Sequence, residues 1–195
     1  LIGMVLGTDD IAKTTNELKN KSFLINDPSE GIGTNFNSEE VRKWKNLFLP
    51  PDLTRGIFSF IIEHTHGSLP QPDLSNSSVI SKLDHLVINT NDADGFIKIY
   101  RDTFNIRLAL DKYIDHWDKR MLFFRLNKTT IEVVESKDEK EPNDSLWGLA
   151  WEVKDIDETH KRLSAEGIEV TPVKNGVKEY TNVVTVKSHC HGVPT

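Results

Sequence analysis

The sequence repeats one pattern three times, and an internal repeat constrains a fold more strongly than any single motif. Each copy begins with an apolar stretch, reaches an Asp and continues into a helix-like segment; the stretches are residues 4–10, 86–92 and 149–155. Asp10, Asp92 and Asp155 occupy corresponding positions. Asp is favoured at a helix start because its carboxylate accepts free backbone N–H groups and complements the positive end of the helix dipole. We therefore predict a strand and then a capped helix in each copy.

The helix after Asp92 is the best defined of the three. Its apolar side chains recur at helical spacing up to a predicted end near Asn105, and they form one stripe of Ala93, Phe96, Ile97, Tyr100 and Phe104. The third copy predicts a helix from Ile156 that ends at Gly167, a residue suited to a helix C-terminus. The first copy predicts a helix over residues 11–18.

Short strand candidates follow each helix. They cover residues 106–113, 120–126 and 129–135 in the second copy, 168–173 and 183–189 in the third, and 44–49 and 57–62 in the first. The two prolines at Pro50-Pro51 predict a turn in the first copy. Residues 22–42 are polar and are predicted to be irregular, with a turn at Gly31-Ile32-Gly33. The repeated unit is strand, helix, strand, strand, strand, so the predicted fold class is α+β.

Composition limits the classes of partner. The chain of 195 residues has 24 Lys and Arg against 30 Asp and Glu, a net charge of −6, which disfavours a protein that binds nucleic acid through phosphate contacts. Its longest apolar runs are far shorter than the roughly 20 residues that cross a bilayer. A single cysteine, Cys190, cannot form an internal disulfide, so a cytoplasmic location is expected. We expect a small molecule as the partner, and neither nucleic acid nor a membrane.

The second copy carries a family resemblance. It opens with Leu83-Asp84-His85-Leu86-Val87-Ile88, starts its helix with Asp-Ala-Asp, continues through Tyr100-Arg101-Asp102-Thr103-Phe104 and closes with Ile131-Glu132-Val133-Val134-Glu135. Together these segments resemble the vicinal oxygen chelate superfamily, which includes glyoxalase I, methylmalonyl-CoA epimerase, extradiol dioxygenases and bleomycin-resistance proteins. The resemblance implies βαβββ modules that pair into cup-shaped mixed sheets, the glyoxalase/bleomycin-resistance/dioxygenase-like fold.

The resemblance also implies a domain division. Residues 1–66 are expected to form part of one glyoxalase-like domain, residues 67–80 a linker, and residues 81–195 a second domain with modules at 81–136 and 145–195. The chain opens at Leu1 in an apolar run and stops at Thr195 after a turn-like segment. We therefore expect the partner module of the first copy and the last strand of the third to lie outside this sequence.

In this family a divalent metal takes its ligands from the first and last strands of each module. The resemblance places the first-strand ligand on His85 and the last-strand ligand on Glu132, and strand alternation allows both side chains to face the same cup. In the first-strand position, the third copy has Gly148 and the first copy Gly3, neither of which ligates, while Glu63 falls at the last-strand position of the first copy. The alternative for His85 and Glu132 is a neutral histidine and a hydrogen-bonded carboxylate that line a pocket.

A firmly held metal needs at least three protein donors. His191, which would share a strand face with His189, is the candidate for the third, and the alternative is that both histidines face solvent at a strand end and turn. Zn²⁺, Mn²⁺, Fe²⁺ or Ni²⁺ would accept such imidazole and carboxylate ligands. Glu132 is also the candidate catalytic residue, because a carboxylate there could move a proton.

Two functions from different classes remain open. The first is a metal-dependent lyase, isomerase or dioxygenase that acts on a small oxygen-bearing metabolite, with the metal chelating two neighbouring substrate oxygens. The second is a metal-free protein that binds or sequesters a small molecule, as bleomycin-resistance relatives do, and Gly148 and Gly3 favour it. The resemblance also allows a homodimer, because the family often pairs modules between chains.

Overall fold

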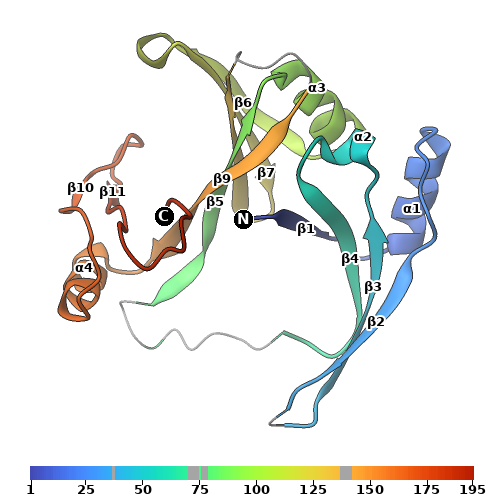
Figure 1. Cartoon of the computed structure of the whole chain (residues 1–195), viewed down its shortest axis with the longest axis horizontal. Coiled ribbons are helices and arrows are strands. Elements are labelled where there is room, and N and C mark those ends of the chain that lie inside the picture. Colours follow the sequence, from blue (N-terminus) through green and yellow to red (C-terminus); the bar gives the residue numbers. More distant parts are fainter. Residues whose placement is uncertain (37, 70–74, 76–78, 137–141) are drawn as a thin grey trace.

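The computed structural model describes residues 1–36, 38–69, 75, 79–136 and 142–195, and most of its strands belong to two mixed sheets (Figure 1). The first sheet has the order β1-β4-β3-β2, and the second has the order β6-β7-β8-β5-β9. The strands of the first are β1 (Gly3–Gly7), β2 (Ser29–Thr34), β3 (Val41–Phe48) and β4 (Phe58–His66). Those of the second are β5 (Ile80–Thr90), β6 (Arg107–Ile114), β7 (Lys119–Leu126), β8 (Thr129–Glu135) and β9 (Asp144–Val153).

The helices are short and lie between the strands of each copy. They are α1 (Ile11–Asn20), α2 (Pro51–Thr54), α3 (Ala93–Ile97), the π-helical η1 (Lys98–Thr103), the 3₁₀ turn η2 (Asp115–Trp117) and α4 (Ile156–Ala165). The predicted apolar stripe after Asp92 is buried, with Phe104 partly so, although its second half is π-helical. No helix in the part of the chain that the structure describes has the length and apolar character needed to cross a bilayer.

In the first two copies the predicted repeat is confirmed as a repeat of topology. In the first copy β1 runs parallel to β4, and in the second β5 runs parallel to β8, with the helix of each copy between its first and second strands. Asp10, Asp92 and Asp155 all cap helices, and their carboxylates accept the N–H groups of Lys13, of Gly95, and of Asp157 and Glu158. The α+β class and the repeated unit predicted from the sequence are therefore correct.

The third copy departs from the prediction after its helix. In place of strands at 168–173 and 183–189, it has the two-residue strands β10 (Lys174–Asn175) and β11 (Asn182–Val183) and an isolated bridge between Val170 and Val186. Helix α4 buries only Thr159, so its apolar side chains remain half-buried or exposed. After its helix the third copy therefore has only a small two-stranded sheet, β10-β11, which is separate from the five-stranded sheet.

The glycines of the first copy form a strand and not the predicted turn. Gly31 and Gly33 lie in β2, which pairs with β3, so residues 29–34 of the supposedly irregular stretch are regular. The Trp44 ring covers this strand, and a Cβ on Gly31 would lie 2.3 Å from the indole Nε1. Glycine is therefore needed for the close approach of an aromatic ring rather than for flexibility.

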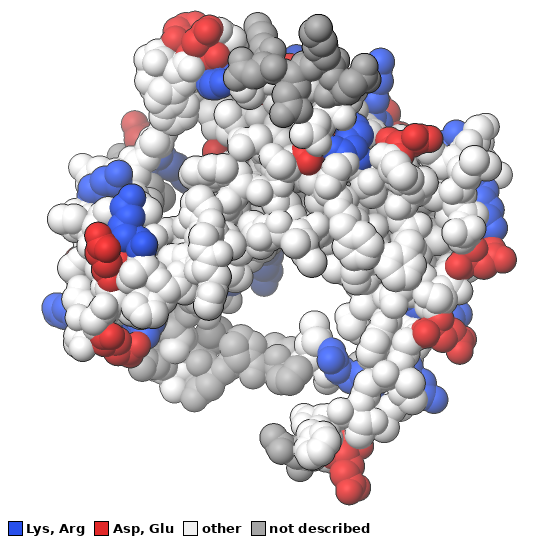
Figure 2. Space-filling model, viewed as in Figure 1, with Lys and Arg blue, Asp and Glu red and all other residues white. Residues whose placement is uncertain are grey.

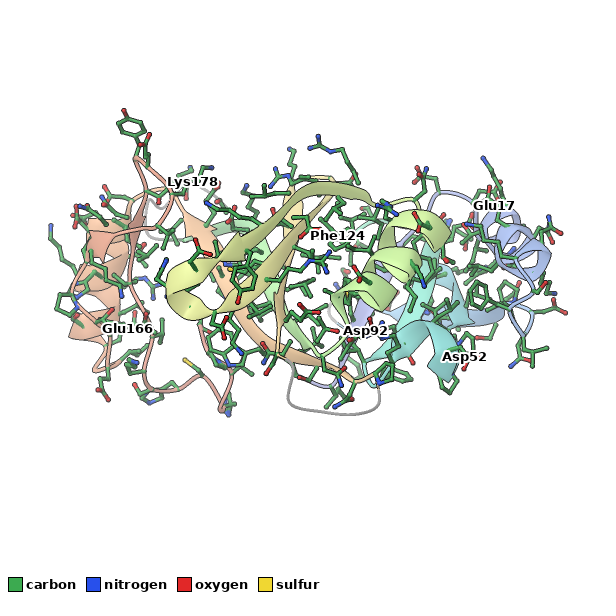
Figure 3. The ribbon with its side chains drawn as sticks, turned by 90° about the horizontal axis from the view of Figure 1, so that it is seen from above. Glu17, Asp52, Asp92, Phe124, Glu166 and Lys178 are labelled. Atoms are coloured by element: carbon green, nitrogen blue, oxygen red, sulfur yellow. The ribbon has the colours of Figure 1, made fainter. Side chains whose placement is uncertain are left out.

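One hydrophobic core runs through the first and second copies. It includes Leu6, Leu47 and Ile61 from the first and Ile88, Phe96 and Phe124 from the second. Seen from above, Asp92 lies near the middle of the molecule beside α2, while Glu17 and Glu166 mark opposite ends (Figure 3). The predicted linker at 67–80 falls mostly outside the described residues, and β5 already begins at Ile80.

Candidate functional site

His85 and Glu132 lie side by side on neighbouring parallel strands. His85 stands opposite Thr130, and Val87, two residues further along the same face, stands opposite Glu132. Because alternate residues of a strand share a face, the two side chains meet, with His85 Nε2 3.8 Å from Glu132 Oε2. The structure thus brings together the two residues, from separate segments, that the resemblance identified as candidate ligands.

The surroundings of this pair orient the imidazole and make the carboxylate more basic. His85 Nδ1 donates to Asp84 Oδ2 over 3.0 Å, which leaves Nε2 directed at Glu132. Burial raises the pKa of Glu132 above its ordinary value, and the charge of His85 opposes that rise. Burial also opposes ionisation of Asp84, but its contacts with His85 and Lys82 outweigh this and hold its pKa below the ordinary value. The site therefore contains an oriented imidazole beside a carboxyl group with increased affinity for a proton.

The third donor is not part of this cluster in the structure. Among the described residues, no three His, Cys, Asp or Glu side chains are grouped as metal ligands would be. His191 lies in a turn with a φ of 49°, and His189 has a φ of 63°, so the predicted strand through them is wrong. The assignment of His191 as a metal ligand stays a prediction.

The third copy has no space for a side chain at the position of His85. Gly148 lies on β9 opposite Val87, and a Cβ there would be 2.9 Å from the carbonyl oxygen of Pro194. The Leu149 N–H donates to that same oxygen over 3.0 Å. The end of the chain therefore lies against β9 and fills the space that a ligand side chain would need.

Strand register corrects the alignment of the first copy. Val5 stands opposite Phe60 as Val87 stands opposite Glu132, so Phe60 and not Glu63 occupies the position of Glu132. Glu63 corresponds instead to Glu135. Both carboxylates cap the first helical residue of their own copy, Glu63 by accepting from the Ile11 N–H and Glu135 by accepting from the Ala93 N–H, each over 3.1 Å. The equivalence follows when the register of the two parallel pairs, β1 with β4 and β5 with β8, is counted from the capping Asp of each copy.

A buried arginine is the main feature that sequence reasoning missed. Arg55, whose side chain is 8% exposed, donates to Thr90, Asp92 and Asp144. Burial raises the pKa of Asp144 to about 6, although Thr90 and Arg55 both stabilise its ionised form. Arg55 belongs to no periodic pattern, so only the assembled tertiary structure identifies it as the link between the first copy and the start of β9.

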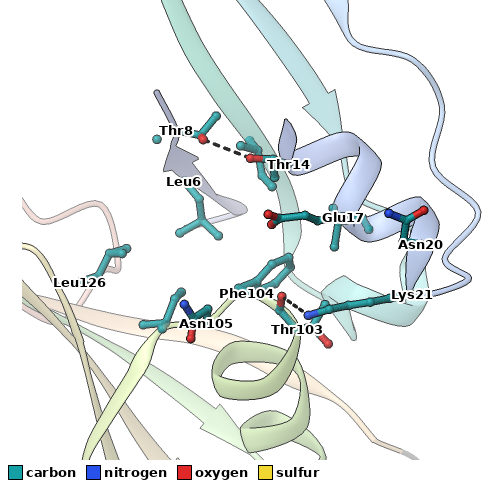
Figure 4. Close-up of a pocket in the computed structure, with 14 residues that line it drawn as sticks. Leu6, Thr8, Thr14, Glu17, Asn20, Lys21, Thr103, Phe104, Asn105 and Leu126 are labelled. Carbon is teal, nitrogen blue, oxygen red and sulfur yellow. Dashed lines mark hydrogen bonds between the residues drawn. The ribbon is translucent and has the colours of Figure 1, made fainter. Parts of the chain in front are cut away.

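A cavity of the described structure lies away from the pair of His85 and Glu132. About 420 Å³ in volume, it separates α1 from the segment after η1 (Figure 4). Leu6, Leu18 and Phe104 contribute apolar walls, while Lys21 Nζ bridges to the Asp102 and Thr103 carbonyl oxygens. Neither His85 nor Glu132 lines it.

Comparison with known proteins places these observations in a family. A family model described as the glyoxalase/bleomycin resistance protein/dioxygenase superfamily matches residues 84–184, and no curated protein matches the chain. The chain is similar to methylmalonyl-CoA epimerase from Mycobacterium tuberculosis, at 20% identity and a TM-score of 0.50, over 63% of this chain and 89% of that one.

Two further structures are similar at a lower score. A hypothetical protein from Bacillus halodurans C-125 has 18% identity and a TM-score of 0.48, over 58% of this chain and 89% of that one. A variant of methylmalonyl-CoA epimerase from Streptomyces coelicolor, in complex with 2-nitronate-propionyl-CoA, has 16% identity and a TM-score of 0.48, over 60% and 94%. At these identities the likeness concerns the fold alone. With the matched family model covering just over half of its residues, the chain belongs to the glyoxalase/bleomycin resistance protein/dioxygenase superfamily, the vicinal oxygen chelate superfamily.

Proposed function

We propose that this chain is a metal-dependent enzyme that acts on a small oxygen-bearing metabolite by isomerase, lyase or dioxygenase chemistry. The observation that carries the proposal is the juxtaposition of His85 Nε2 and Glu132 Oε2 at 3.8 Å, on adjacent strands of the second copy. The net charge of −6 supports a small molecule rather than nucleic acid as the partner, and the single cysteine supports a cytoplasmic location.

The donor chemistry of this pair fits a divalent ion. An imidazole and a carboxylate suit Zn²⁺, Mn²⁺, Fe²⁺ or Ni²⁺, and His191 is the proposed third ligand. When bound, such an ion would polarise neighbouring substrate oxygens and stabilise negative charge on them. The described residues of one chain bring only two of the donors together, so the proposed site is a half-site in this structure.

The protein's own groups would prepare the chemistry. Asp84 fixes the imidazole of His85 through Nδ1, which directs the Nε2 lone pair toward the site. Burial raises the proton affinity of Glu132, so this carboxylate is suited to remove a proton from a carbon next to a carbonyl group. Glu132 would act in one of two ways, as a ligand or as this base.

Metal analysis of the purified protein tests the proposal. We expect stoichiometric metal in protein purified without chelator, and its loss in His85→Ala and in Glu132→Gln. His64→Ala is the matched control, because His64 is exposed on the other sheet, and it should retain the metal. Metal content that is equal in all four proteins would refute the assignment of the ligands.

A metal-free binding protein is the second candidate. The specific observation in its favour is Gly148, whose position has no space for a ligand side chain because Pro194 occupies it. This function predicts no metal and no affinity for added Zn²⁺, Mn²⁺, Fe²⁺ or Ni²⁺ by calorimetry. A thermal-shift screen of aromatic, α-keto and catecholic compounds would then identify the ligand class. Chemical conversion of any of these compounds by the protein would instead support the first candidate, an enzyme.

A further inference from the structure

The face of the second sheet that carries His85 and Glu132 also carries a one-sided set of charges. Residues that stand opposite each other on neighbouring strands share a face, so the strand register identifies the members of this face. The charged residues that β6, β7 and β8 contribute to it are Arg107, Lys112, Lys119, Arg125 and Glu132. Cations therefore outnumber carboxylates on this face, although the chain as a whole has a net charge of −6.

Charges of the two signs are mixed over other parts of the surface. Around the rim of the view in Figure 2, acidic and basic side chains lie next to one another. A surface of mixed charge serves solubility, whereas a face of one sign concentrates ligands of the opposite sign. The face that carries Glu132 is therefore suited to a ligand with negative charge.

Two of these cations, Arg107 and Arg125, stand directly opposite each other on the antiparallel strands β6 and β7. Like charges in this position repel. Both side chains are exposed, and Arg125 donates to the hydroxyl group of Thr130. Neither guanidinium is paired with a carboxylate in the part of the chain that the structure describes. An anion held between the two groups would remove the repulsion and supply the missing partner.

The strand register places the arginine pair in line with His85. Arg125 stands opposite Thr130 on β8, and Thr130 stands opposite His85 on β5. Neighbouring strands lie about 4.8 Å apart, so the backbones at Arg125 and His85 are separated by about 10 Å. Because the Arg125 side chain reaches Thr130, its guanidinium extends toward His85.

An apolar strip lies beside this row of residues on the same face. Phe123 stands opposite Glu132 on β8 and opposite Leu110 on β6. Phe123 is half-buried, and Leu110 is 48% exposed. A ligand that lay across β7 would therefore place apolar atoms on Phe123, between an anionic end at the arginines and a reacting end at Glu132.

We propose that Arg107 and Arg125 bind an oxyanion of the substrate, a carboxylate or a phosphate group, while His85 and Glu132 act on its other end. A guanidinium group suits this task because its planar fork of N–H donors binds two oxygens of such an anion at once. The inference rests on the proposed function for the reacting end and adds the substrate class. The substrate is an anionic metabolite whose charged group lies about 5 to 10 Å from the carbon that reacts.

Calorimetric titration with two simple anions tests this site. We expect inorganic phosphate or succinate to bind saturably at constant ionic strength, and the anion that binds more tightly identifies the phosphate or the carboxylate class. Arg107→Gln and Arg125→Gln should each weaken that binding by about tenfold or more. Arg101→Gln is the matched control, because Arg101 is exposed on η1, outside the sheet, and its replacement removes the same charge.

Two results would overturn the proposal. One is the absence of saturable binding of both anions, and the other is an affinity that neither Arg107→Gln nor Arg125→Gln changes. Titration of protein treated with chelator excludes binding of the anion to a metal. Arg125→Gln should keep the metal content of the unsubstituted protein, and His85→Ala should keep the anion affinity of the chelator-treated protein. The anion site and the metal site can therefore fail independently.

Discussion

Single residues carry the electrostatics of this protein, and the clearest example is Asp144. Its carboxylate is almost completely buried and accepts from Arg55 over 3.0 Å and from Thr90 over 2.6 Å. Burial nevertheless dominates and raises its pKa to about 6. Since the folded state then holds the proton more tightly than the unfolded chain, the contribution of Asp144 to the free energy of unfolding is full below the ordinary pKa of 3.8 and is lost as the pH rises toward 6.

Replacement of Asp144 by Asn should remove this dependence on pH. We expect the free energy of unfolding of the unsubstituted protein, minus that of Asp144→Asn, to fall between pH 3.8 and about 6 and to be constant above that range. Denaturant titrations at a series of pH values measure the difference. A difference that stays level across this range would contradict the raised pKa.

Among the elements, β2 shows how a single packing contact selects residue type. Gly31 and Gly33 stand in a strand, where glycine is normally unfavourable, because the Trp44 ring lies across it. At the helix ends, too, a single contact accounts for the residue type. Glu63 and Glu135 occupy one position of the repeat and perform one task, the capping of the first helical residue of their own copy.

Gly31→Ala should destabilise the first sheet. The added methyl group would lie 2.3 Å from the Trp44 indole, and overpacking of this kind costs about 1 to 3 kcal/mol. Gly7→Ala is the control, since no atom outside its chain neighbours lies within 4 Å of a Cβ there, and it should leave stability unchanged. Equal melting temperatures for the two variants would mean that the Trp44 ring can move away at little cost.

At the scale of the whole molecule, the copies are joined by burial and by one charged contact. The hydrophobic core continues from Leu6 and Ile61 into Phe96 and Phe124, and Arg55 reaches from the end of α2 to the ends of β5 and β9. The backbone adds to this link, because the Asp144 N–H donates to the Arg55 carbonyl oxygen. The first copy is therefore packed onto the second as part of one folded body.

Arg55→Ala should weaken this connection. It leaves the buried carboxylate of Asp144 without its cationic partner, which typically costs about 3 to 5 kcal/mol. Arg107→Ala, which removes an exposed arginine, should change stability by less than about 0.5 kcal/mol. Calorimetry makes the comparison, and a loss for Arg55→Ala no larger than that of Arg107→Ala would show that the ion pair does not hold the copies together.

The local sequence was sufficient to predict elements whose cause is local. The capping Asp of each copy, the apolar stripe after Asp92 and the strands from Arg107 to Glu135 were all predicted, because caps and periodicities act over a few residues. The pairing of His85 with Glu132 was predicted through the family resemblance, and strand alternation made it consistent.

Tertiary structure decided the features that depend on distant neighbours. Residues 29–34 form a strand by pairing with β3, and the role of Glu63 depends on the register between β1 and β4. Arg55 contacts a buried carboxylate 89 residues away. By itself the sequence determined the repeated unit and the superfamily resemblance. Only the folded chain decided which carboxylate faces His85, which one caps a helix and which one takes the charge of Arg55, because register and burial arise when separate strands meet.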